Sequence, residues 1–143
     1  MAQRSTCLRS GYGAVAVIDD GIVSTGYNGS RSGAENCCDR GYCLREGSES
    51  RTNYHLCSAV HAEQNVVAKS KVSLIGSIVY LVAFDQKTGK EKVWDRVFPC
   101  ITCFSLMIQA GVKELCIRKD DTAHTPFKAP LLYWSFLENR HGT

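Results

Sequence analysis

The sequence lacks every feature that would place it outside the ordinary globular proteins. No apolar stretch approaches the length of a membrane-spanning helix, so we expect no contact with a membrane. Residues 1–10 have no apolar core, which argues against a secretory signal and favours a cytoplasmic location. No lysine or arginine run and no internal repeat is present, and the formal net charge is only +3. Charge alone therefore does not indicate a nucleic-acid-binding protein.

The length and hydrophobic content of the sequence are sufficient for one hydrophobic core. Its 143 residues are 44% hydrophobic and 22% charged, which is typical of one globular domain spanning residues 1–143. Eight cysteines are many for this length. In a secreted protein they would suggest a disulfide framework, but without a signal sequence we expect reduced thiols. More than two of them are then candidates for metal ligands.

Two short segments carry the strongest chemical pattern. His61-Ala62-Glu63 is followed by Pro99-Cys100-Ile101-Thr102-Cys103. The ligands His61, Cys100 and Cys103 suit Zn²⁺, and three protein ligands leave one position open, as in catalytic zinc sites. Glu63 is placed to move protons at that position. This is the established signature of zinc-dependent nucleobase deaminases. The alternatives are a buried histidine near two core cysteines, or a non-catalytic zinc module with a fourth protein ligand.

Hydrophobic patterning predicts an α/β fold with a mixed sheet between helices. A tight turn at residues 19–21 joins two strands, and strand, helix and strand in succession imply a parallel crossover. Both metal-binding segments should lie at helix N-termini, where the helix dipole favours thiolates. The polar residues 118–126 are candidates to line a site, and residues 131–137 fit either a closing helix or a strand. The expected strands are 12–19, 22–27, 78–84 and 112–117, and the expected helices are 58–70, capped by Ser58, and one opened by Pro99 and ended by Gly111.

A long irregular segment, residues 30–57, is rich in cysteine and polar in character. Irregular segments of this length are usually functional, and a bound metal could hold this one in place. The hypothesis is a second, structural zinc; the alternatives are free thiols or His55 in place of one cysteine. Its ligands would be Cys7, one of Cys37 and Cys38, Cys43 and Cys57.

The segment Gly26-Tyr27-Asn28-Gly29 precedes this irregular region. Its glycines allow a sharp bend or a close approach to a ligand, and a plain turn is the equally good alternative.

With these residues in view, the chain resembles the deoxycytidylate (dCMP) deaminases of the cytidine deaminase-like superfamily, from about Cys7 to about Asp121. The resemblance rests on the zinc motif together with the flanking motifs. These are Tyr-Gly-Ala-Val in the first strand, Gly-Tyr-Asn-Gly at 26–29, Gly-Tyr-Cys-Leu-Arg at 41–45, Cys57, and His-Ala-Glu-Gln-Asn at 61–65.

The resemblance implies a three-layer α/β/α fold and a hydrolase that converts dCMP and water to dUMP and ammonia. It also implies a homo-hexamer, activated by dCTP and inhibited by dTTP with Mg²⁺ on the triphosphate. Asn28 and Ala62 would contact the substrate, with Asn28 at its sugar. The residues expected near the effector are Gly29, Glu35, Asn36 and Asn65.

The sequence departs from the family at both ends. Family members usually carry a helix of a dozen or more residues before the position of Cys7, where only six residues precede it here. We therefore expect altered N-terminal packing, and no residue after Asp121 is matched.

The candidate residues for binding the substrate phosphate are Arg31, Arg45, Arg118 and Lys119. The alternative activities are deamination of free cytidine and deamination of tRNA or single-stranded DNA.

Overall fold

The computed structural model describes residues 1–49, 52–93, 97–117 and 127–131 of the chain. Its centre is a five-stranded mixed sheet in the order β2-β1-β5-β6-β7, beside a two-stranded ladder of β3 and β4. In the large sheet β5 and β6 run parallel, and the other neighbours run antiparallel. The elements are η1 (Ala2–Arg4), β1 (Ser10–Ile18), β2 (Gly21–Tyr27), β3 (Gly29–Ser30), α1 (Cys37–Arg40), η2 (Tyr54–Leu56), β4 (Ala59–Val60), α2 (Ala62–Lys69), β5 (Ile78–Asp85), α4 (Ile101–Gln109), β6 (Glu114–Ile117) and β7 (Phe127–Pro130).

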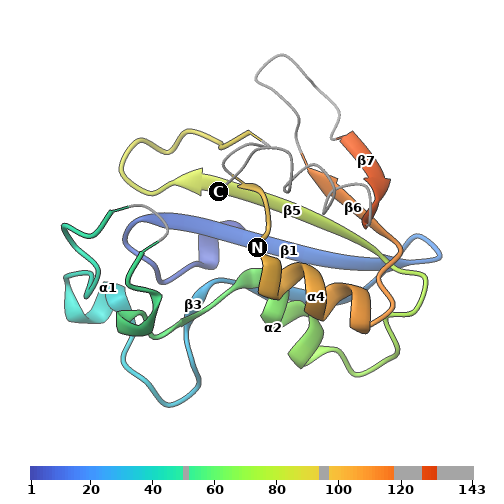
Figure 1. Ribbon diagram of the computed structural model, residues 1–143, viewed down its shortest axis with the longest axis horizontal. Helices are drawn as coiled ribbons and strands as arrows, with labels where there is room; N and C mark the ends of the chain where they lie inside the picture. The colour runs from blue at the N-terminus through green and yellow to red at the C-terminus, as the bar shows by residue number, and fades with distance from the viewer. Residues whose placement is uncertain (50–51, 94–96, 118–126, 132–143) are drawn as a thin grey trace.

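The hydrophobic core lies between one face of this sheet and two helices. Figure 1 shows α2 and α4 side by side on that face. Alternate residues of β1 and β5 point into the core, because successive side chains of a strand face opposite sides. On the other face Ala2 of η1 lies over Gly13 of β1. The predicted α/β fold with a mixed sheet and helices is confirmed. The buried core includes Ala14, Ala16, Val66, Val79, Leu81, Ala83, Phe104 and Met107.

The predicted turns and crossover are present. Asp19 and Asp20 both have positive φ, 48° and 61°, as the two-residue turn of a twisted hairpin requires. The helix α4 leads from β5 to the parallel β6, and Gly111 follows its end with a φ of +83°. The N–H of Gly111 donates to Ile108 O at 3.0 Å, and that of Val112 donates to Met107 O at 3.0 Å. These paired bonds are a Schellman cap, which explains why the helix stops there.

Two predicted helix starts are wrong by a few residues. Ser58 does not cap α2, because Ala59 and Val60 pair with β3 as strand β4, and the N-cap is His61. Pro99 does not occupy the first turn of α4. It lies one residue before the N-cap, which is Cys100.

The cysteine-rich segment is less irregular than predicted, since it contains α1 and η2. Strand β7 was not predicted from the sequence. Of the closing element expected at 131–137, only Leu131 is described, and it is buried; residues 118–126 also lie outside the described part. Within the described residues, no helix is long and apolar enough to cross a membrane.

Candidate active site

The three predicted metal ligands meet where α2 and α4 begin. His61 is the N-cap of α2, Cys100 is the N-cap of α4, and Cys103 follows within the first turn of α4. His61 Nδ1 lies 3.7 Å from Cys100 Sγ and 3.4 Å from Cys103 Sγ. The three ligand atoms all lie within 4.8 Å of one another. One imidazole nitrogen and two sulfurs at this separation fit Zn²⁺ with a position left for a further ligand.

The two thiols of this site differ in acidity. A hydrogen bond from Cys103 is the main cause that lowers the pKa of Cys100 to about 4, and the contact with His61 lowers it further. The same bond to Cys100, together with burial, raises the pKa of Cys103. The hydrogen bond to Cys100 also raises the pKa of His61. One thiolate is therefore available at neutral pH, and a divalent cation would displace the proton of the second.

Glu63 is the acidic residue in the first turn of α2, the helix that begins at His61. It is the second residue of α2, and it is only 3% exposed. Burial raises the pKa of this carboxyl, which the nearby His61 partly opposes. A carboxyl with a raised pKa can both take up and release a proton near neutral pH. The structure thus brings the predicted acid–base residue into the helix turn that begins at the metal ligand.

The backbone of His61 is fixed by a residue that the sequence analysis did not single out. Gln64 Oε1 accepts the N–H of His61 at 2.8 Å, which is the return half of a capping box. A Gln or Glu three residues after an N-cap is the sequence signal for this bond. This hydrogen bond was not predicted, because the helix was expected to begin at Ser58.

The segment that contains Gly26 and Asn28 is not a turn, because Tyr27 ends β2 and Gly29 begins β3. A side chain on Gly26 would come within 2.3 Å of Ala62 O, so the close approach is to α2. Asn28 Oδ1 accepts the N–H of Tyr12 at 2.8 Å, and Nδ2 donates to the backbone of β1. Both predicted substrate residues, Asn28 and Ala62, are buried, at 8% and 0% exposure. Their contact with a substrate stays a prediction.

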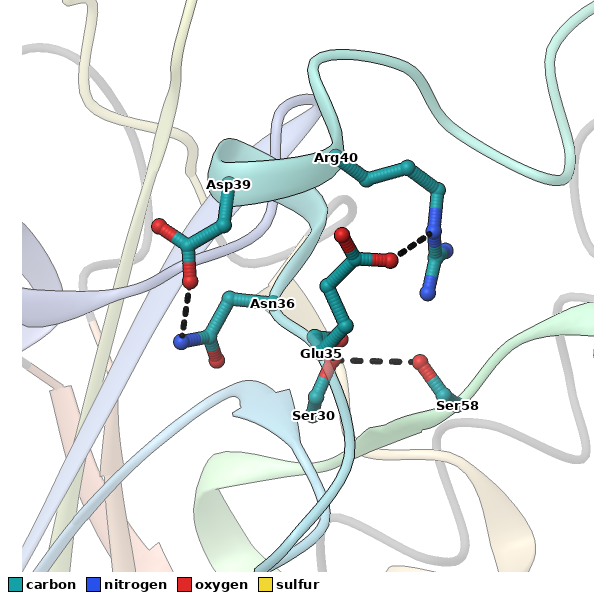
Figure 2. A network of polar contacts seen from close by, with 6 residues as sticks. All are labelled: Ser30, Glu35, Asn36, Asp39, Arg40 and Ser58. Carbon is teal, nitrogen blue, oxygen red and sulfur yellow. Dashed lines mark hydrogen bonds and ion pairs between the residues drawn. The ribbon is translucent and has the colours of Figure 1, made fainter.

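The residues expected at an effector site fall into two places. Asn65 Nδ2 donates to Tyr27 O at 2.8 Å and so ties α2 to β2. Glu35 and Asn36 lie with α1, where Arg40 Nε donates to Glu35 Oε2 at 3.0 Å and Asn36 Nδ2 donates to Asp39 at 2.9 Å. Figure 2 shows these pairs beside the contact between Ser30 and Ser58, whose hydroxyl oxygens are 3.1 Å apart. Gly29 is buried at the start of β3.

Within the cysteine-rich segment, a small pocket is lined by Cys37, Cys43 and Cys57 and by Arg40 and Arg45. We call it the cysteine pocket. Burial, followed by the charges of the Cys7, Cys43 and Cys57 thiols, raises the pKa of Cys37, so the four predicted ligands are neighbours. In the described residues, however, only the His61 site holds three ligand atoms within 4.8 Å.

Cys37 and Cys38 are distinguished by their surroundings. Cys37 is buried in the cysteine pocket, whereas Cys38 is exposed and its Sγ contacts Asp39 Oδ1 at 3.6 Å. Cys37 is therefore the better candidate ligand.

Of the basic residues considered for a phosphate seat, Arg45 is connected to the candidate site through the ring of Tyr54. Its guanidinium carbon stands 4.3 Å from the centre of the Tyr54 ring, and that ring lies 6.4 Å from the His61 ring. Arg31 is exposed. Arg118 and Lys119 lie outside the described residues. No spacing rule in the sequence points to the contact of Tyr54 with His61.

Comparison with known proteins agrees with this geometry. The family described as "Cytidine and deoxycytidylate deaminase zinc-binding region" matches residues 1–119. The deoxycytidylate deaminase of a Mycobacterium phage is 33% identical over 83% of this chain and 86% of its own length. ComE operon protein 2 of Bacillus subtilis is 32% identical over 87% of this chain and 56% of its own length. The deoxycytidylate deaminase of Schizosaccharomyces pombe is 32% identical over 80% of this chain and 32% of its own length.

Among solved structures, the dCMP deaminase of cyanophage S-TIM5, in complex with dCMP and dUMP, superposes with a TM-score of 0.55. It is 32% identical, and the match covers 80% of this chain and 69% of that one. The chain spans between about a third and a little over half of the length of several curated relatives. The family match extends over most of the chain and includes all three residues of the metal site. The chain belongs to the cytidine and deoxycytidylate deaminase family.

Proposed function

We propose that the chain catalyses the hydrolytic deamination of dCMP to dUMP and ammonia. The observation that carries this proposal is the buried Glu63 placed beside a three-ligand site that fits zinc. A purely structural zinc site would complete its coordination with a fourth protein ligand, whereas three ligands leave room for reaction. The named dCMP deaminases among the relatives support this nucleotide as the substrate.

In this reaction His61, Cys100 and Cys103 would hold the ion. Bound zinc supplies a water that is acidic enough to react at neutral pH. The Glu63 carboxylate would take one proton from the attacking water and deliver it to N3 of the cytosine ring, which makes C4 a better electrophile for the remaining hydroxyl, and that hydroxyl would bond to C4. The carboxylate would then take the second proton from the new C4 hydroxyl and pass it to the exocyclic amine. The C4–N bond breaks and the C4 carbonyl forms, so that dCMP and water become dUMP and ammonia. Burial of Glu63 excludes bulk water from these transfers.

A comparison of substrates tests the proposal. Ammonia release is measured with dCMP, cytidine, and a tRNA anticodon hairpin at equal concentrations. We expect turnover of dCMP to exceed that of the other two substrates. Preference for cytidine would assign the chain to nucleoside deamination, and preference for the hairpin would assign it to nucleic-acid deamination. Absence of all three activities in zinc-loaded protein would reject a catalytic role.

A second zinc bound by Cys7, Cys37, Cys43 and Cys57 is part of the same proposal. The mutual influence of these thiols supports it, and a metal would draw them closer than they lie in the structure. Metal analysis of the purified protein should give two zinc ions per chain. In a Cys43→Ser variant the expected number is one. A single zinc in the unaltered protein would reject the second site.

Regulation is the third part of the proposal. An effector site near Gly29, Glu35, Asn36 and Asn65 would bind dCTP as activator and dTTP as inhibitor, each with Mg²⁺, in a homo-hexamer. The position of Asn65 supports the link, because this residue joins the catalytic helix to β2. Deamination rates measured with and without each triphosphate test the regulation, and light scattering tests the assembly. Rates that do not respond to either triphosphate would reject it.

A further inference from the structure

The cysteine pocket contains two guanidinium groups whose hydrogen bonding is incomplete. Among the described residues, Arg40 Nη1 and Arg45 Nε are both buried and have no acceptor. Both arginines line the pocket together with Cys37, Cys43 and Cys57. A buried donor that carries charge is costly to leave unpaired, so such groups usually have a partner in the functional state. The missing partner should therefore be an acceptor in or beside this pocket.

Each arginine is held in place by a second contact. Arg40 Nε donates to Glu35 Oε2 at 3.0 Å, and the Arg40 side chain is 15% exposed. Figure 2 shows this pair at the end of α1. The guanidinium of Arg45 lies over the ring of Tyr54. Because both side chains are oriented in this way, their unpaired N–H groups are not simply free to turn into solvent.

The acceptor that the pocket itself offers is thiolate sulfur. Four thiolates around one Zn²⁺ leave an excess of two negative charges, which two guanidinium groups would balance. The charge of Arg40 already acts on Cys37. Hydrogen bonds from neighbouring groups to metal ligands orient those ligands and strengthen metal binding.

We propose that Arg40 and Arg45 are the charge-balancing donors of the cysteine pocket, and that they hold its thiolates by N–H···S hydrogen bonds when zinc is bound. This inference rests on the second zinc proposed above. It assigns both arginines to metal retention and does not assign them to the substrate phosphate.

The test is competitive removal of zinc from the full chain with a chromogenic chelator. Unaltered protein should release zinc in two steps, and the step absent from Cys43→Ser belongs to the cysteine pocket. Arg40→Gln and Arg45→Gln should release that zinc at a chelator concentration about 10–100-fold lower, because lost outer contacts weaken metal binding by that order. The other step, from the His61 site, should shift less than the pocket step, because its three ligands are unaltered. Lys71→Gln removes an exposed positive charge outside the pocket, and both of its release steps should match those of the unaltered protein.

Arg40→Lys and Arg45→Lys keep the charge but lose the planar set of donors, so they should also release the pocket zinc early. They decide the question if the glutamine variants do not fold. Release curves of both arginine positions that coincide with the unaltered protein would overturn the inference. If the unaltered protein holds one zinc, the inference falls together with the second site. Deamination of dCMP by that same sample still tests the proposed activity separately.

Discussion

Gly26→Ala should displace α2 without touching any of the proposed catalytic groups. Gly26 lies in β2 under the first turns of α2, and an added Cβ would lie 2.3 Å from Ala62 O and 2.7 Å from Val66 N. Both of these atoms belong to the helix backbone, so no side chain can rotate out of the way. An ordinary contact requires about 1 Å more, which either the helix or the strand must provide.

The helix is not free to move. Ser24 Oγ donates to Val66 O at 2.7 Å, and Asn65 Nδ2 donates to Tyr27 O at 2.8 Å, so α2 is bonded to β2 on both sides of Gly26. Overpacking of this kind typically costs about 1–3 kcal/mol of unfolding free energy. For a domain of this size that corresponds to a Tm lower by roughly 3–12 °C. Because α2 begins at His61 and carries Glu63, a shift of about 1 Å should also lower kcat/KM by up to about 100-fold.

Thermal unfolding and steady-state deamination of dCMP measure the two effects. Gly21→Ala is the matched control, since its added Cβ would meet only Ile18 O, at 3.4 Å, and the residue is exposed. We expect that control to unfold and react like the unaltered protein. A Gly26→Ala protein with unchanged Tm and unchanged kcat/KM would refute the reasoning, because it would show that β2 and α2 need not approach so closely.

Three further substitutions test individual side chains. Glu63→Gln should keep its zinc, measured by metal analysis, and lose turnover by roughly 10²–10⁴-fold or more, because proton transfer is removed; near-normal activity would contradict the assigned role. Asn28→Ala breaks two hydrogen bonds to the β1 backbone, of 2.8 and 2.9 Å. It should lower the unfolding free energy by about 1–3 kcal/mol, measured with urea, since the partners are left unpaired. Gln64→Ala removes the acceptor of the His61 N–H and should cost about 0.5–2 kcal/mol, whereas Gln64→Glu, which keeps an acceptor, should cost less.

Periodicity and turn chemistry predicted the frame of this fold well. The Asp19-Asp20 turn, the apolar strand β5 and the glycine after α4 each depend on rules that act within a few residues. The grouping of His61, Cys100 and Cys103 was also predicted, because the residue types and spacing of the motif are those that zinc requires.

The errors came from contacts between distant segments. Ser58 is a good N-cap by composition, but the residues after it pair with β3, and that pairing delays the helix until His61. The segment of Gly26 and Asn28 suggested a turn as one alternative, whereas Gly26 lies against α2 and Asn28 bonds to β1. Local sequence does not contain the position of a partner strand or helix, so these assignments required the three-dimensional arrangement.

The ladder of β3 and β4 explains why the cysteine-rich segment belongs to the site. Gly29 pairs with Val60 and Ser30 pairs with Ala59, so the two ends of the segment between them lie side by side. The N–H of Arg31 donates to Ser58 O at 3.1 Å, which extends this closure by another residue. The strand β4 ends immediately before His61.

Because β4 connects that segment directly to His61, a shift of the segment should also displace His61. The side chains provide a second connection, because Arg45 lines the cysteine pocket and lies over Tyr54, whose ring neighbours that of His61. A metal that tightens the cysteine pocket would restrain both connections at once. This predicts that Cys43→Ser, although it leaves all three catalytic ligands intact, should weaken retention of the zinc at His61 as well as removing its own. Loss of one zinc with unchanged chelator resistance of the other would show that the two sites are independent.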